Sequence, residues 1–275
     1  METKDITFVI VTFHSEKVIF DCLELLPEDS KKIIIENSKN SDLKNILEKK
    51  YPNLKCYLMD ENLGYGKANN IGINFSQTEL VFILNPDVRF KSSEIIKFLK
   101  IISNEKFVIA APIENEELNL SSNQNDFEDV NYVKGFAMLL NKKYLKEEYF
   151  DENIFLYLEE IDLCKRVKDN KGRILKVHIP AIHLGASSHG DIKNFEMEKS
   201  RNWHWMWSKF YFKRKHHGYL SGLVSTLPSF LSSLMKYFFY SFTMNKIKKS
   251  IYKMRFLGLL NSYLLEKSFY RPNIK

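Results

Sequence analysis

The 275-residue sequence is poor in three features that mark particular classes of protein. Its three cysteines, Cys22, Cys56 and Cys164, lie far apart and form no Cys-x-x-Cys pair, which argues against a zinc cluster and favours a reducing compartment. The N-terminus has neither the basic start nor the small-residue cleavage site of a signal peptide. Residues 193–275 hold 3 Asp/Glu against 16 Lys/Arg, whereas residues 1–192 hold 31 against 25. We therefore expect a cytoplasmic protein with a basic tail.

The composition, with 44% hydrophobic and 27% charged residues, predicts a folded core rather than a disordered chain. The length suits one large domain, or one domain with an appendage. The basic tail is also rich in Phe, Tyr, Trp and Leu. Nucleic acid is one partner for a basic segment, but the mixture of aromatic and basic residues suits an anionic membrane surface better.

Strand-like and helix-like segments alternate through the first half of the chain. Residues 5–13, 31–36 and 54–59 read as strands, and apolar residues at helical intervals follow the first two, over 18–26 and 43–50. This alternation predicts a parallel, doubly wound sheet with helices on both faces.

Residues 80–88, L-V-F-I-L-N-P-D-V, are the stretch around which the rest is organised. A short apolar run ended by a polar turn is typical of a strand buried on both faces, and ligands of open α/β sheets bind where such strands end. Pro86 has a fixed φ and favours an extended Asn85, so Asp87 would be held rigidly at this edge. The tripeptide alone favours an ordinary strand exit with a solvated Asp; a carboxylate presented to a metal and a diphosphate needs support from elsewhere in the chain.

A glycine-containing loop follows the third strand. Gly64 and Gly66 begin a helix that runs to Phe75, but Asn69 stands where a dinucleotide fingerprint has its third glycine, and the spacing does not match a phosphate-binding loop. The glycines still imply positive φ or close backbone approach at this helix.

The second half continues the pattern less regularly. A helix is expected from near Ser93, strands over 107–112, 133–140 and 173–180, and a polar, acidic loop over 114–129.

A cluster of acids lies where a further helix is expected, from about Tyr157. Glu159, Glu160 and Asp162 fall within one turn, and Asp162 and Arg166 would be i,i+4 partners. Such acids could serve only to favour the helix dipole. A lone histidine such as His183, in the loop after the last strand, is usually a surface residue.

Taken together, several of these segments carry a family resemblance. They occur in family order over roughly residues 5–190 and read V-I-V-T-F-H-S, I-I-I-E-N-S-K-N-S-D, N-L-G-Y-G-K-A-N-N-I-G, F-I-L-N-P-D-V, V-K-G-F-A-M-L-L, F-D-E-N-I-F-L-Y-L-E-E-I-D-L-C-K-R and H-L-G-A-S-S. The chain resembles the family 2 glycosyltransferases with a GT-A fold, especially the bacterial rhamnosyltransferase-like branch.

The resemblance implies an α/β GT-A domain over 1–195, with a nucleotide-binding part to about 112 and an acceptor part over about 130–195. It implies inverting, metal-dependent transfer of a sugar from a nucleotide-diphosphate donor to a hydroxyl of a glycan or lipid-linked glycan. Carried over by position, Asn85 and Asp87 form the Asp-x-Asp site, Asp87 would bind Mn²⁺ or Mg²⁺, and His183 would be a further ligand or diphosphate contact.

The remaining site residues follow from the same resemblance. Glu160 would be the general base, with Glu159 and Asp162 as substitutes. Both Glu36 and Glu160 stand where the family usually has Asp, which leaves donor identity and rate open. The donor-binding set is Thr12, Phe13, Glu36, Asn62, Gly64, Asn69, Asn85 and Asp87, and Asn70 would lie near the ribose or the sugar.

The leading expectation is a rhamnosyltransferase that uses dTDP-rhamnose in cell-surface polysaccharide synthesis. The alternatives are a UDP-hexose or UDP-N-acetylhexosamine transferase and a catalytically inactive sugar-nucleotide-binding scaffold. Nucleic acid is not expected as a partner.

The tail, residues 196–275, is expected to be helical, with Trp203, Trp207, Phe210 and Arg214 at helical spacing. Pro228 and several serines interrupt its most apolar part, which favours helices lying in the interface at the inner face of the cell membrane over a span. Packing on the catalytic domain or on a second subunit is the alternative.

Overall fold

The computed structural model describes residues 1–115, 125–145, 148–185 and 191–272. The chain divides into two compact units. The first contains Met1–Asp151 and Glu160–Ser188, and the second contains Glu152–Glu159 and His189–Lys275.

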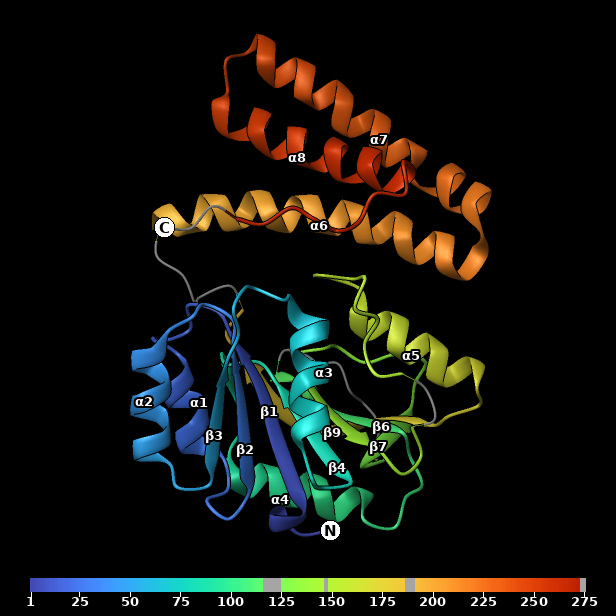
Figure 1. The fold of residues 1–275 in the computed structure, drawn as a ribbon. Helices are drawn as coiled ribbons and strands as arrows, with labels where there is room; N and C mark the ends of the chain where they lie inside the picture. The colour runs from blue at the N-terminus through green and yellow to red at the C-terminus, as the bar shows by residue number, and fades with distance from the viewer. Residues whose placement is uncertain (116–124, 146–147, 186–190, 273–275) are drawn as a thin grey trace. The chain divides into compact units, whose positions relative to one another are not determined.

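All strands among the described residues belong to the first unit (Figure 1). They are β1 (Ile6–Thr12), β2 (Lys31–Glu36), β3 (Leu54–Leu58), β4 (Leu80–Leu84), β5 (Val88–Arg89), β6 (Ile109–Glu114), β7 (Phe127–Asp129), β8 (Ala137–Asn141) and β9 (Ile174–His183). The helices of the first unit are η1 (Thr3–Asp5), α1 (Ile19–Leu25), α2 (Ser41–Lys50), α3 (Tyr65–Phe75), α4 (Ser92–Ile102) and α5 (Glu159–Asp169).

The sheet has the order β3-β2-β1-β4-β8-β6-β9-β5, and β7 pairs with β9. Strands β1 to β4 are parallel, β8 runs antiparallel to both β4 and β6, and β9 is parallel to β6. The carboxyl ends of β1, β2, β4, β6 and β9 therefore reach the same edge, where β8 begins. The predicted α/β class is confirmed, but the sheet is mixed rather than wholly parallel, because β8 runs antiparallel to β4 and β6.

Helices cover both faces of this sheet (Figure 1). On one face α1, α2 and α4 bury residues such as Leu23, Leu47 and Phe98 against the β1 and β4 side chains Phe8 and Phe82. On the other face α3 and α5 pack on the alternate residues of the same strands. Apolar residues on both sides of the central strands explain their continuous hydrophobic sequence.

Several boundaries differ from the sequence prediction, and two of them bear on the site. Strand β8 starts at Ala137 rather than at 133, because residues 133–136 turn to make contacts described below. The loop expected over 114–129 contains β7, which pairs with β9, while residues 116–124 lie outside the described residues.

Gly64, just before α3, has the positive φ that the sequence predicted for the start of this helix, and Gly72 within the helix allows a close approach. Gly64 caps the helix at φ 83°, a left-handed conformation that glycine adopts without a steric cost. At Gly72 a Cβ atom would lie 2.3 Å from Val9 Cγ1, so glycine is what lets α3 approach β1 this closely.

The second unit consists of α6 (Asp191–His217), α7 (Tyr219–Phe242) and α8 (Lys246–Tyr263) as successive hairpins (Figure 1). The helical tail is thus confirmed. Trp203, Trp207 and Phe210 of α6 are all buried, which agrees with the packing alternative for these three residues, and Gly258 lets α8 approach the Trp203 carbonyl. Among the described helices, none combines the length and hydropathy of a bilayer-spanning segment.

Candidate active site

The turn after β4 is fixed at the carboxyl edge of the sheet by backbone hydrogen bonds to its neighbours. The Asn85 N–H donates to the Phe136 carbonyl (2.8 Å), and the Leu184 N–H donates to the Asp87 carbonyl (3.1 Å). The Asp87 side chain is buried, with 7% of the residue exposed. The sequence prediction of a rigidly held carboxylate at this edge agrees with these contacts.

His183, at the end of β9, lies between two carboxylates. Its Nε2 is 3.4 Å from Asp87 Oδ1 and its Nδ1 is 3.6 Å from Oε1 of Glu114, the last residue of β6. The Asn85 amide is 3.5 Å from the same Nε2, and the Phe136 ring stacks on the imidazole with centroids 5.0 Å apart. The hydrogen bond to Asp87 raises the pKa of His183, with burial opposing and Glu114 adding to the effect.

The segment Lys134-Gly135-Phe136 joins the parts of this edge. Lys134 pairs with Glu114, and the Tyr65 hydroxyl donates to the Gly135 carbonyl (2.5 Å). A Cβ at Gly135 would lie 3.3 Å from Cβ and Cγ of Glu160, so the glycine backbone packs directly on this acid. The three residues therefore link the His183 stack, the start of α3 and the proposed base.

The three acids at the start of α5 have different surroundings. Glu160 is partly exposed, and burial raises the pKa of its carboxyl group. Glu159 is buried at the first residue of the helix. Asp162 is completely buried and accepts a hydrogen bond from Arg166 Nε at 2.8 Å, which confirms the predicted i,i+4 pair.

Arg166 extends that pair into the preceding chain. Its guanidinium also donates to the carbonyls of Glu148 (2.5 Å) and Tyr149. Asn70 of α3 supports the same segment by a reciprocal pair of bonds with the Phe150 backbone at 2.8 and 2.9 Å. The Asn70 amide is thus engaged by backbone, a contact that sequence reasoning had not anticipated when it assigned Asn70 to the donor.

Within the second unit, residues just before these acids are held against α6. The Ser208 hydroxyl donates to the Leu156 carbonyl (2.9 Å), and the Phe155 ring stacks on His204 (4.5 Å). Tyr157 and Leu158 have φ of 72° and 70°, a left-handed conformation that costs non-glycine residues about 1–2 kcal/mol each. The packed ring and the hydrogen bond offset this strain immediately before Glu159.

At the ends of β1 and β2 and on α3, several buried oxygens lack a hydrogen-bond partner among the described residues: Thr12 Oγ1, Asn37 Oδ1 and Asn69 Oδ1. Asn37 and Asn69 use their amide groups to donate to the Gly64 carbonyl (3.2 Å) and the Tyr65 carbonyl (3.0 Å), which leaves the oxygens as free acceptors. Buried polar atoms without partners are rare in folded proteins and suit a ligand that donates hydrogen bonds.

Glu36, at the end of β2, is completely buried and engaged locally. Its two carboxylate oxygens accept from the backbone N–H of Ser38 (3.0 Å), the Ser38 hydroxyl and the backbone N–H of Asn40 (2.8 Å). A contact of Glu36 with a nucleotide base stays a prediction, and the observed bonds give it a role in shaping the turn at 37–40.

The other predicted donor residues also lie along this edge. Asn62 accepts from the Gly64 N–H (3.0 Å) and so fixes the loop before α3. The Phe13 N–H lies 3.2 Å from the Ser15 hydroxyl just after β1, and the neighbouring His14 has φ 52°.

The described residues contain no cluster of three or more His, Cys, Asp or Glu side chains that could hold a metal ion. Asp87 and His183 still bring an oxygen and a nitrogen donor together at 3.4 Å. A hard dication commonly keeps waters or substrate phosphates as ligands beside one or two protein groups. The donor set therefore fits an ion completed by a diphosphate rather than one enclosed by protein.

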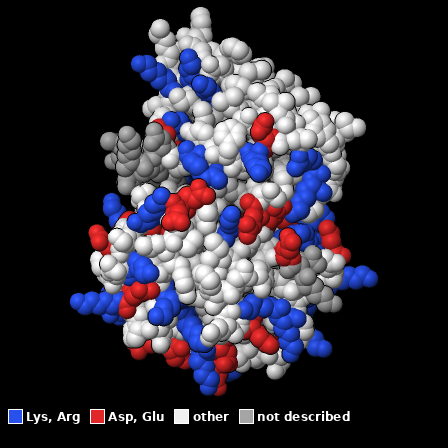
Figure 2. Space-filling view, viewed as in Figure 1, with Lys and Arg blue, Asp and Glu red and all other residues white. Residues whose placement is uncertain are grey.

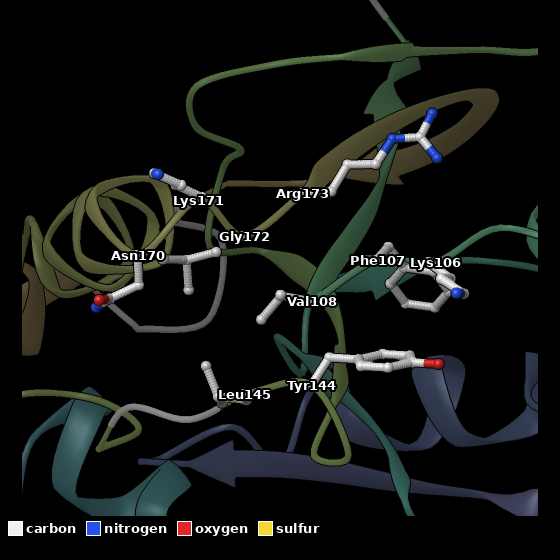
Figure 3. Close-up of a pocket in the computed structure, with 10 residues that line it drawn as sticks. Lys106, Phe107, Val108, Tyr144, Leu145, Asn170, Lys171, Gly172 and Arg173 are labelled. Carbon is white, nitrogen blue, oxygen red and sulfur yellow. The ribbon is translucent and has the colours of Figure 1, made fainter.

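Two of the cavities lined by described residues lie beside β6 and β9; the first reaches Glu114 at the end of β6, and its Asp129 is ion-paired with Arg173 of the second. One, of about 410 Å³, is lined by Glu114, Lys134 and Phe136 of the site together with residues 129–133. The other, of about 280 Å³, lies where β6 and β9 begin (Figure 3), and Arg173 on its rim is paired with Asp129 and Glu105. Because α/β sheets bind ligands at the carboxyl ends of their strands, the first is the candidate site.

Sequence reasoning missed Glu114, Lys134 and Gly135 as site residues. Glu114 was placed in a loop and the other two in a strand. The V-K-G-F run was visible, but only the antiparallel entry of β8 shows that it reaches the same edge as Asp87.

Comparisons with known proteins identify the family of this chain. The sequence profile of glycosyl transferase family 2 matches residues 7–163. Rhamnosyltransferase WbbL of Escherichia coli is 24% identical over 247 residues, which are 75% of this chain and 92% of WbbL. The hexosyltransferase Agl10 of low-salt glycan biosynthesis in Haloferax volcanii is 24% identical over 191 residues, which are 60% of this chain and 62% of Agl10.

A solved structure supports the fold. Mannosyltransferase PcManGT from Pyrobaculum calidifontis, solved with GDP-Man and Mn²⁺, superimposes with a TM-score of 0.58 at 10% identity and covers 94% of this chain and 87% of its own. The family profile covers more than half of the chain, including Asp87 and Glu160. The chain therefore belongs to glycosyl transferase family 2 and has the GT-A fold.

Proposed function

We propose that this protein transfers a sugar, with inversion, from a nucleotide-diphosphate donor to a hydroxyl of a growing cell-surface glycan. The observation that carries the proposal is the segment 134–136, which contacts the Asp87–His183 pair, the 410 Å³ cavity and Glu160. Donor, acceptor and base can thus meet at one edge of the sheet.

The donor would bind at the ends of β1, β2 and β4. Thr12, Asn37 and Asn69 offer buried oxygens to the hydroxyl and N–H groups of a nucleoside, while Phe13, Asn62 and Gly64 shape the surrounding loops. Asp87 and His183 would hold Mn²⁺ or Mg²⁺, which neutralises the negative charge of the leaving nucleoside diphosphate.

Glu160 is the proposed general base. Its carboxylate takes the proton of the acceptor hydroxyl as that oxygen attacks the anomeric carbon, and the bond from this carbon to the diphosphate oxygen breaks on the opposite face. Its raised pKa makes it a stronger base than an ordinary glutamate. Asp162 suits this role less, because it is completely buried and bound to Arg166.

The acceptor would enter the cavity beside Lys134 and Phe136. About 410 Å³ matches the lower range of small-molecule pockets and accommodates a terminal sugar with its polar contacts. A lipid-linked glycan is the favoured acceptor, since it would also account for a protein held peripherally at the inner face of the membrane.

The donor is proposed to be dTDP-rhamnose, with support from the match to rhamnosyltransferase WbbL over most of both chains. The match to hexosyltransferase Agl10 keeps a UDP-hexose or UDP-N-acetylhexosamine as the second candidate. An inactive sugar-nucleotide-binding scaffold is the remaining alternative, and turnover separates it from both.

The test is a thermal-shift screen with Mn²⁺ and nucleotide diphosphates or their sugars, followed by turnover of the donor that binds. A ligand that binds the native state raises the unfolding midpoint, and stabilisation by one nucleotide identifies the base. Asp87→Asn should lose the metal-dependent shift, whereas the exposed Asp42→Asn on α2 should keep it. Absence of a shift with every donor, in folded protein, would overturn the donor site; binding without turnover would favour the scaffold.

A further inference from the structure

Helix α7 packs against the rest of its unit with small and polar residues. Its buried residues are Gly222, Thr226 and Ser233. A Cβ at Gly222 would lie 3.1 Å from the Phe210 ring of α6, and the Thr226 hydroxyl lies 2.9 Å from the Tyr263 hydroxyl of α8. The contacts that hold α7 in place also use the half-buried Leu223 and Phe230, but most of its other large apolar side chains take no part in them.

Those large side chains face solvent instead. They recur every three or four residues, which places them within about 80° of arc on an ideal helix. They are Leu220 (75% exposed), Val224 (72%), Leu227 (42%), Leu231 (47%), Met235 (65%), Phe238 (61%) and Phe242 (90%). This set is called the α7 stripe below. Helices of globular proteins normally turn such a stripe toward the core, so the α7 stripe is arranged to meet a partner.

The stripe ends at an apolar tip surrounded by lysines. Met244 (85% exposed) and Ile247 (64%) continue it through the turn into α8. Lys236 lies over the Tyr252 ring (5.2 Å) and Lys248 over the Tyr240 ring (5.3 Å), which holds both ammonium groups beside this tip. Apolar and aromatic residues next to lysines suit the boundary between acyl chains and head groups.

The charge of this region selects the partner. Residues 199–265 contain 12 Lys/Arg and no Asp or Glu. On the face drawn in Figure 2, the α7 and α8 part of the chain is largely white with blue side chains. A second copy of this face would bring lysines against lysines without an acid between them, whereas anionic lipid head groups neutralise them.

We infer that α7 lies flat on an anionic lipid surface, with the α7 stripe and the tip among the acyl chains and the lysines at the phosphates. The inference rests on the proposed function only in that a lipid-linked acceptor would be met at this surface. The inference specifies that α7 is the helix that binds the membrane, that the α7 stripe is its membrane-facing side, and that anionic lipids are required.

The test is co-sedimentation of the full-length chain with vesicles of phosphatidylcholine alone or mixed with phosphatidylglycerol. We expect binding to the anionic vesicles, weakened by added salt. The triple variant Val224→Ser, Leu231→Ser and Phe238→Ser should bind at least tenfold more weakly. The double variant Lys246→Gln and Lys248→Gln should lose about fivefold per lysine and part of the salt dependence.

A matched control uses exposed apolar residues of the first unit. Ile46→Ser with Ile96→Ser, at sites 51% and 53% exposed, should leave vesicle binding unchanged. Tryptophan fluorescence checks that each variant is folded, and light scattering gives its oligomeric state.

Unchanged vesicle binding by the triple variant would overturn the inference. It would also be overturned if the wild-type protein were a dimer that does not bind vesicles and if the triple substitution made it a monomer. Donor turnover is measured without vesicles. Vesicle binding without turnover would contradict the proposed function alone, and turnover without vesicle binding would contradict this inference alone.

Discussion

In the first unit carboxylates lie buried at the edge of a sheet, whereas in the second unit large apolar side chains lie exposed along a helix. Asp87 is 7% exposed and Asp162 is completely buried, while Leu220 and Phe242 are 75% and 90% exposed. Each pattern reverses the usual distribution of side chains, and each has a cost in the isolated chain. Each pattern is therefore a reason to look for a binding partner, a ligand at the sheet edge and a surface against the helix.

Burial alone does not identify a functional carboxylate within the first unit. Asp162 and Glu36 are completely buried, but Arg166 binds the first and the turn at 38–40 binds the second. Asp87 instead faces a histidine at the carboxyl edge of the sheet, where Thr12 Oγ1 has no hydrogen-bond partner among the described residues. The useful distinction is between buried acids that are satisfied by the fold and those that face a ligand site.

The largest effect is expected for Glu160→Gln. General base catalysis contributes about 10²–10⁴-fold, so transfer should fall by that factor while the thermal midpoint and donor binding stay close to wild type. The measurement is the initial rate of transfer under saturating donor.

The pH profile sharpens the same test. The base must be deprotonated, and its pKa is raised by burial above the ordinary glutamate value of 4.5. As the pH is lowered, wild-type activity should therefore begin to fall at a pH above 4.5. The residual activity of Glu160→Gln should not show this decrease in acid. An unchanged rate for Glu160→Gln would transfer the role of base to another group.

Asp162→Asn should lower stability and leave activity largely unchanged, the reverse of the result expected for Glu160→Gln. Removing one partner of a buried ion pair leaves an uncompensated charge on Arg166, which typically costs about 3–5 kcal/mol of unfolding free energy. Turnover per folded molecule should stay within several-fold of wild type. The exposed pair of Lys165 and Asp169 on the same helix is the control, because Asp169→Asn should cost at most about 0.5 kcal/mol. A large loss of turnover in folded Asp162→Asn would make Asp162 a candidate base again.

The sequence predicted local geometry best at positions where the residue type permits only one or two conformations or contacts. Asp87 after a buried strand, Gly64 at the start of α3 and the i,i+4 spacing of Asp162 and Arg166 all have the geometry that was predicted. Each depends on neighbours close in the chain, which a single sequence makes visible.

Contacts between distant strands were not accessible in this way. Glu114 and Lys134 meet because β6 and β8 are adjacent in the sheet, and no local pattern encodes that adjacency. Asn70 reads as a ligand residue in its motif, yet it binds the Phe150 backbone 80 positions away. The same limit applies to α7, whose apolar spacing does not reveal which side faces solvent.

Gly135→Ala tests the contact between the 134–136 segment and the base. The new methyl group would lie 3.3 Å from Glu160 Cβ and Cγ, so the acid must shift by a few tenths of an ångström. Because catalysis is sensitive to such displacements, we expect kcat to fall about tenfold with little change in the donor KM. Gly172→Ala at the opposite edge of the sheet, where a Cβ would meet Val167 Cγ1 at 2.5 Å, should lower the thermal midpoint without this selective loss of kcat. Equal kcat losses in both variants would mean that Gly135 acts only through stability.

The stability of the second unit in acid should depend on His204. His204 is completely buried between Phe155 and Trp203, its Nε2 donates to the Tyr270 carbonyl (2.7 Å) and its Nδ1 accepts from the Ser268 hydroxyl (3.0 Å). Burial lowers its pKa from 6.5 to about 3. Both nitrogens are therefore satisfied in the neutral form.

Below pH 6.5 the unfolded chain binds a proton at this histidine that the folded chain does not bind. The contribution of His204 to the free energy of unfolding should therefore be complete above pH 6.5. Below this pH the free energy of unfolding should fall by up to about 1.4 kcal/mol per pH unit, toward pH 3. Urea unfolding followed by tryptophan fluorescence reports this unit directly, because all three tryptophans lie in α6. His204→Gln should be less stable at neutral pH but should show a shallower loss in acid, whereas His217→Gln, at an exposed site, should retain the wild-type slope. An unchanged slope in His204→Gln would assign the acid sensitivity to other groups. Since His204 stacks on Phe155, acid should also loosen the strained residues that lead into Glu159.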